Sequence, residues 1–157
     1  LDQDGWDDLI IGSGRGGHLN VLLNKNGNGF FPATNSLLDR KVTRDQTGIL
    51  GMRQTLLVGS SNYEDRSTNG GLIRLYDFKR NLAGDSVLGS SFSTGPLAFA
   101  DVDGDGDLDL FIGGRAVSGR YPEPADSLLL RNEGGRFVPM QRWERLGLVC
   151  GAIFSVI

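Results

Sequence analysis

The 157-residue sequence predicts an all-β fold built from short strands. Its 24 glycines are about twice the usual share and, with only five prolines and no Gly-X-Y period, they indicate many tight turns. Short apolar runs alternate with Gly, Asn, Asp and Pro, which is typical of strands and the turns between them. The same arrangement also recurs along the chain, and its spacing favours a partial β-propeller.

The repeat is clearest in two stretches that align without gaps. DVDGDGDLDLFIGG, which starts at Asp101, matches LDQDGWDDLIIG at the beginning of the chain, so that Asp109 falls on Asp8. Further on, LLLRNEGGRF (residues 128–137) matches VLLNKNGNGF (residues 21–30), again without gaps. Between them, TLLVGS and GLIRLYDF form a degenerate copy that has lost its acidic loop.

The repeat length selects the architecture. A marker glycine ends the first apolar run of each copy, and Gly12, Gly59 and Gly113 lie 47 and 54 residues apart. Periods of this size, filled with short strands, indicate propeller blades rather than a helical solenoid.

The repeats divide the chain, as one segment of a propeller domain over residues 1–157, into four parts. These are an incomplete blade (1–45), a degenerate blade (46–92), a complete blade with the acidic loop (93–145) and the first strand of a next blade (146–157). Because Leu1 aligns with the second residue of the acidic stretch, we expect the chain to be a piece of a larger propeller.

The acidic loop predicts a metal site. Aspartates occupy every second position of residues 101–109, and their carboxylates would repel one another without a cation. Side-chain oxygens of Asp101, Asp103, Asp105 and Asp109, with the backbone carbonyl of Asp107, form a set of hard ligands that suits Ca²⁺. Mg²⁺ fits less well, since it keeps more water and takes fewer carboxylates.

Two other interpretations of this loop are weaker. A solvated acidic turn is the plainer one, because Asp and Gly are ordinary turn residues, but the pattern is complete in this loop and a partial second copy occurs at the same place in the repeat. An EF-hand needs a glutamate at the twelfth loop position and flanking helices, and that position here is Ile112 in a strand-like run.

A second, weaker metal site is predicted at the start of the chain. Asp2, Asp4 and Asp8 repeat three of the acidic ligands, and the Trp6 carbonyl takes the backbone position. The first ligand of the pattern is missing, so we expect this loop to bind metal weakly or not at all. In the middle copy the segment at the place of the acidic loop, GILGMRQ, carries no carboxylate and is expected to bind no metal.

Composition excludes several classes of function. The formal charge is −3 and the Lys and Arg residues are scattered, so there is no basic stripe for nucleic acid and no polybasic segment for a membrane surface. No apolar run approaches the ~20 residues of a membrane-spanning helix. The single Cys150 rules out an internal disulfide.

The acidic loops and the strand spacing resemble the FG-GAP/VCBS repeats of integrin-alpha-like, calcium-binding propellers. GGRAVSGRYPEP and the stretches that follow it resemble the cartilage-acidic-protein-like subgroup, which carries an ASPIC/UnbV domain. The resemblance implies four-stranded antiparallel blades, usually seven in a ring, with the metal loop between the first and second strands. It also implies an extracytoplasmic location and a signal peptide on the parent protein.

Three hypotheses about function stay open. The first is a non-enzymatic, calcium-stabilised module that packs with the remaining blades of its propeller and presents loops to a protein or a glycan. The second is part of a propeller enzyme acting on polysaccharide, for which His18, the single histidine, is the conceivable base. The third is recognition through GRAVSGRYPEPAD, where Arg115, Arg120 and Tyr121 lie in an inserted loop.

Overall fold

The computed structural model describes residues 1–66, 71–88 and 92–140, and every helix or strand in these residues is a β-strand. The predicted all-β class is therefore confirmed. The strand expected over residues 146–157, and Cys150 within it, lie outside the described residues. In the described part of the chain there is no helix with the length and apolar character needed to cross a membrane.

The strands form three antiparallel meanders in which each strand pairs with the next one along the chain. The N-terminal sheet contains β1 (Leu9–Ile11), β2 (Asn20–Asn24) and β3 (Phe30–Pro32). The middle sheet contains β4 (Asp45–Met52), β5 (Thr55–Ser61), β6 (Gly71–Asp77) and β7 (Leu82–Leu88). The C-terminal sheet contains β8 (Phe92–Ala100), β9 (Asp109–Val117), β10 (Leu128–Glu133) and β11 (Arg136–Pro139).

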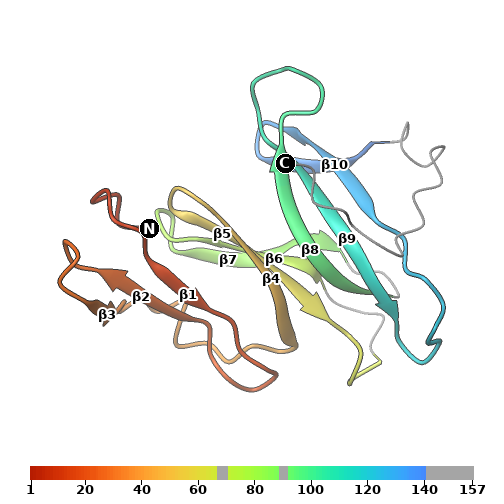
Figure 1. Ribbon diagram of the computed structural model, residues 1–157, viewed down its shortest axis with the longest axis horizontal. Helices are drawn as coiled ribbons and strands as arrows, with labels where there is room; N and C mark the ends of the chain where they lie inside the picture. The colour runs from red at the N-terminus through yellow and green to blue at the C-terminus, as the bar shows by residue number, and fades with distance from the viewer. Residues whose placement is uncertain (67–70, 89–91, 141–157) are drawn as a thin grey trace.

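The three sheets lie side by side in chain order, with the middle sheet between the other two (Figure 1). Successive side chains of a strand point to opposite faces, and β5 uses both faces for burial. Leu57 packs with Leu110 and Ile112 of the C-terminal sheet, whereas Leu56 and Val58 pack with residues of the N-terminal sheet. Burial on both faces explains why β5 reads as a continuous apolar run.

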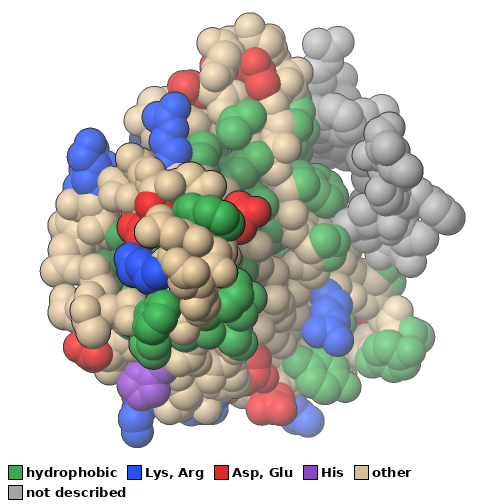
Figure 2. Space-filling view, turned by 60° about the vertical axis from the view of Figure 1, so that its left-hand side comes forward, with side chains coloured by type: hydrophobic (Ala, Val, Ile, Leu, Met, Phe, Trp, Pro, Cys, Tyr) green, Lys and Arg blue, Asp and Glu red, His purple; other side chains and the backbone are tan. Residues whose placement is uncertain are grey.

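Side chains at equivalent positions of the repeat are buried in two of the sheets and exposed to solvent in the third. Leu9, Leu56 and Leu110 each precede the marker glycine by three residues, and their exposed fractions are 42%, 1% and 0%. Ile11, two residues after Leu9 on the same face, is 46% exposed. The N-terminal sheet therefore presents an apolar face on the side away from the middle sheet, and Figure 2, turned toward that side, shows hydrophobic side chains gathered there.

Steric contacts explain why the marker glycine of the middle sheet, Gly59, is a glycine. Thr47 and Thr94 occupy matching irregular points of β4 and β8, and their Oγ1 atoms lie 2.6 Å apart, which links the first strands of two adjacent sheets. A Cβ atom at Gly59 would lie 2.4 Å from the Oγ1 of Thr94 and 2.8 Å from that of Thr47. Glycine is therefore the residue that allows this hydrogen bond to form.

The gapless alignment of residues 128–137 with residues 21–30 is wrong by one residue. Asn24 and Asn132 donate their backbone N–H to Asp8 and Asp109, at 3.0 and 2.8 Å, and so occupy equivalent positions. Each asparagine side chain also accepts a hydrogen bond from the glycine three residues later. The runs of leucine that guided the alignment carry no register information, because a shift by one residue still matches Leu to Leu.

Candidate metal centre

Hydrogen bonds from its own backbone shape the acidic loop, residues 101–108, which joins β8 to β9. The two oxygens of Asp101 accept the backbone N–H groups of Gly104 and Gly106, at 2.7 and 3.0 Å. Both glycines have left-handed backbone angles, φ 78° and 91°, which a residue without Cβ adopts at little cost. The alternating Asp and Gly residues therefore stabilise the turn of the loop, in addition to providing the predicted metal ligands.

Asp109, the first residue of β9, is the most deeply placed acid of the loop. Its side chain is fully buried and its two oxygens accept the N–H groups of Val102 and Asn132, at 2.9 and 2.8 Å. The side-chain amide of Asn132 also donates to the Leu108 carbonyl oxygen at 3.1 Å. These bonds hold the acidic loop against β10 and orient the Asp109 carboxylate.

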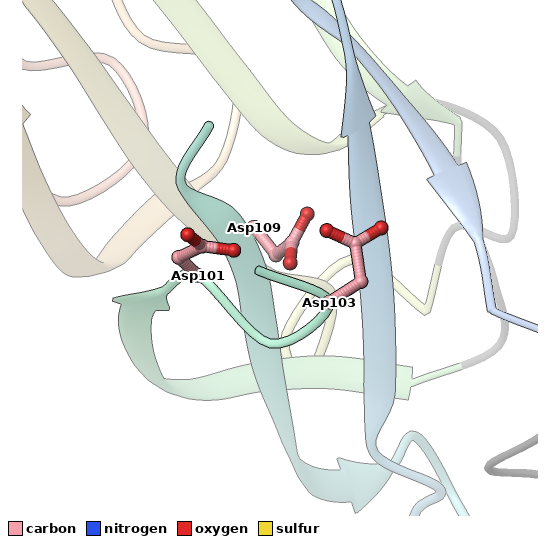
Figure 3. Close-up of side chains that lie close together, drawn as sticks. All are labelled: Asp101, Asp103 and Asp109. Carbon is pink, nitrogen blue, oxygen red and sulfur yellow. The ribbon is translucent and has the colours of Figure 1, made fainter. Parts of the chain in front are cut away.

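Three of the five predicted aspartates come together. Asp101, Asp103 and Asp109 each offer one carboxylate oxygen, and these oxygens lie within 4.8 Å of one another (Figure 3). Two oxygens bound to one Ca²⁺ ion are at most about 5 Å apart, because each lies 2.3–2.6 Å from the metal. The group can therefore hold one hard cation, although three carboxylates do not by themselves distinguish Ca²⁺ from other such ions.

Among the residues that the structure describes, the charge around this group is only partly compensated. Arg131 Nη1 lies 4.0 Å from Asp103 Oδ2, at the limit of an ion pair, and the same guanidinium pairs with Glu133. The hydrogen bond to Glu133 raises the pKa of Arg131, and the charges of Glu133, Asp103 and Asp105 raise it further. One shared arginine thus faces three clustered carboxylates.

Asp105 and Asp107 lie outside the group of three. Both side chains are exposed, and the Asp105 carboxylate accepts the backbone N–H of Asp107 at 2.8 Å. In this geometry Asp105 stabilises the turn of the loop rather than joining the other three carboxylates.

The first acidic loop pairs with a lysine of its own sheet. Lys25 donates to Asp2 at 3.0 Å. The Lys25 hydrogen bond is the main cause that lowers the pKa of Asp2. Asp8 accepts the backbone N–H of Asn24 at 3.0 Å.

Asp2, Asp4 and Asp8 do not form a group of converging carboxylates comparable to the one at Asp101, Asp103 and Asp109 in the described part of the chain. Asp4 accepts the Trp6 backbone N–H at 3.0 Å, which repeats the turn contact between Asp105 and Asp107.

The first loop also carries a strained residue that glycine would relieve. Gln3 has φ 64° at the position equivalent to Gly104. A left-handed conformation costs a residue with a Cβ roughly 1–2 kcal/mol, part of which glycine loses again through its greater freedom in the unfolded chain. We expect Gln3→Gly to raise the free energy of unfolding by about 0.5–1 kcal/mol, measured by urea denaturation. The reciprocal Gly104→Gln should lower it, and a stabilising Gly104→Gln would contradict the argument.

Three residues that matter at these loops escaped the sequence analysis: Lys25, Arg131 and Asn132. Lys25 directly follows β2, and Arg131 lies in β10, so both are far from the aspartates in the chain. A signal for Asn132 did exist, since Asn-x-x-Gly occurs at residues 24–27 and 132–135.

The other candidate residues lie away from the acidic group. The His18 ring nitrogen Nδ1 lies 3.2 Å from the Leu38 carbonyl oxygen, and His18 forms an isolated bridge with Lys41. The inserted loop between β9 and β10 carries Tyr121, which is 81% exposed, and an ion pair of Arg120 with Glu123 at 3.3 Å.

Comparison with known proteins identified no relative. No protein-family model matches the chain, and neither curated proteins nor solved structures contain a match.

Proposed function

We propose that the chain is a calcium-stabilised, non-enzymatic module that forms part of a β-propeller. The observation that carries the metal proposal is the convergence of Asp101, Asp103 and Asp109, one of them fully buried, beside Arg131, which also pairs with Glu133. A bound Ca²⁺ would neutralise these carboxylates and tie the loop to the start of β9. Metal binding of this kind adds its free energy to folding.

The order of the sheets supports the propeller. Each four-stranded sheet is a meander, adjacent sheets pack face to face, and their first strands meet at the Thr47–Thr94 hydrogen bond. The exposed face with Leu9 and Ile11 is the one that the equivalent residues of the other two sheets bury against a neighbour. A further sheet of the same kind on that face would continue the series.

An extracytoplasmic location fits a structural calcium site, because extracellular modules bind Ca²⁺ at the 10⁻⁴–10⁻³ M concentrations present there. The partner, a protein or a glycan, would meet the loops at the sheet ends. The β9–β10 loop is suited to this role: Ala125 anchors it in the core, Ser118 bonds to the Tyr63 carbonyl at 3.3 Å, and Tyr121 projects into solvent.

Thermal unfolding tests the metal proposal directly. With Ca²⁺ at about 100 times its dissociation constant, the free energy of unfolding should rise by about 2.7 kcal/mol, which for a chain of this size raises Tm by about 5–10 °C. The measurement compares Tm in CaCl₂, in MgCl₂ and in EGTA at equal ionic strength. Identical melting curves in CaCl₂ and EGTA would contradict the proposal, and an equal rise in MgCl₂ would remove the preference for calcium.

A further inference from the structure

A cavity of about 250 Å³ lies between the middle sheet and the segment that crosses to it from the N-terminal sheet. Its floor comes from the middle-sheet face that carries Val58 and Tyr76, and its rim from residues 40–44. Its lining is mixed: the polar side chains include Gln46, Ser60 and Thr43, and the apolar ones are Leu37, Val42 and Val58. The cavity is on a different sheet from the acidic group, so it is a separate site.

The cavity is positively charged although the whole chain has a net charge of −3. Four cations line it, Arg40, Lys41, Arg44 and Arg74, against two carboxylates, those of Asp65 and Asp85. The two carboxylates pair with Arg44 and Arg74, at 3.5 and 3.4 Å. Arg40 and Lys41, both exposed at the rim, take part in none of the ion pairs found among the described residues.

The inner wall of the cavity is held in place. Tyr76 is only 4% exposed, and the Arg74 guanidinium lies 5.8 Å from the centre of its ring. Stacking on the ring and the bond to Asp85 fix the guanidinium at the cavity wall, where its remaining N–H groups can donate. A preformed arginine of this kind loses little conformational entropy when it binds an oxyanion.

The repeat provides an internal comparison for these two residues. Across β5 and β6, Arg74 lies opposite Val58 and Tyr76 lies opposite Leu56. In the C-terminal sheet the equivalent positions hold leucines: Leu128 opposite Ile112 and Leu130 opposite Leu110. In the C-terminal sheet these leucines belong to the apolar core between the sheets. The interface between the N-terminal and middle sheets thus has arginine and tyrosine at positions where the interface between the middle and C-terminal sheets has leucine. Two such sheets can therefore pack without a polar cavity between them.

We propose that this cavity binds a small, hydroxylated organic anion of the acidic-sugar class, with its carboxylate between Arg40, Lys41 and Arg74. The volume exceeds what an inorganic oxyanion needs, and the amide and hydroxyl groups of the lining can bond sugar hydroxyls. Charge-assisted hydrogen bonds from arginine and lysine provide the selectivity for an anion.

A titration of the ¹⁵N-labelled chain, followed by amide chemical shifts, tests this proposal. The probes are sodium glucuronate, sodium sulfate and glucose at constant ionic strength. Glucuronate should give saturable shifts at residues of the cavity such as Gln46 and Tyr76, and sulfate should bind more weakly because it lacks hydroxyl groups. Glucose, which has the hydroxyls and no charge, should give no saturable shift.

Matched variants separate binding from surface charge. Arg40→Gln and Lys41→Gln should each weaken glucuronate binding about tenfold, the loss of one charge-assisted hydrogen bond. Arg74→Leu, which copies the C-terminal sheet, should abolish binding, and Lys79→Gln, an exposed lysine away from the cavity, should leave it unchanged. The amide spectrum of each variant reports whether it is folded.

Two results would overturn the proposal: no saturable response to glucuronate at millimolar concentration, or one that survives Arg74→Leu in a folded variant. Sulfate binding as tight as glucuronate would overturn the acidic-sugar assignment.

Discussion

Replacing Leu110 by alanine is expected to lower the free energy of unfolding by about 3–4 kcal/mol, whereas the same change at Leu9 should cost less than about 1 kcal/mol. The two residues occupy equivalent positions of the repeat, but Leu110 is 0% exposed and Leu9 is 42% exposed. Alanine at position 110 would leave a cavity in the core between the middle and C-terminal sheets, and a core relaxes only partially around such a cavity. At position 9 solvent already reaches the side chain.

Urea denaturation of the two variants measures this difference, with Leu56→Ala as the matched control from the middle sheet. Leu56 is 1% exposed, so its loss should resemble that of Leu110. Equal losses at Leu9 and Leu110 would contradict the uncovered face of the N-terminal sheet. A small loss at Leu110 would contradict the packing of the C-terminal sheet on the middle sheet.

Asp109→Asn is expected to abolish the rise in Tm that calcium produces. The variant removes the charge of the buried ligand, and its amide places a donor group where the carboxylate accepts from Val102 and Asn132. One of these N–H groups then loses its acceptor, which costs about 1–3 kcal/mol even without metal. The variant should therefore melt lower than the native chain in EGTA and show no further change in CaCl₂.

Asp107→Asn provides the matched control for this prediction. Asp107 is exposed and outside the group of three, so its variant should keep most of the calcium response and its stability in EGTA. A full calcium response in Asp109→Asn would contradict the metal centre. Loss of the response in both variants would instead indicate that calcium acts through the total negative charge of the loop.

The acidic loop shows which features can be predicted from residues close together in the sequence and which cannot. Its turn could be predicted because Asp and Gly are ordinary turn residues, and the Asp101 side chain bonds backbone groups only three and five residues away. The convergence of Asp101, Asp103 and Asp109, without Asp105, depends on how the side chains turn in the folded loop. The ion pair between Lys25 and Asp2 could not be predicted in this way, because it depends on the end of β2 lying beside the first loop.

By itself, the sequence determined the all-β class, the turns and the acidic loop, because alternation, glycine and aspartate act over a few residues. The tertiary structure decided the register that aligns Asn24 with Asn132, the burial of Leu110 against the exposure of Leu9, and the cavity beside Arg74. These features depend on which sheet lies against which face. That information comes from residues distant in the chain and is absent from the local pattern of any one strand.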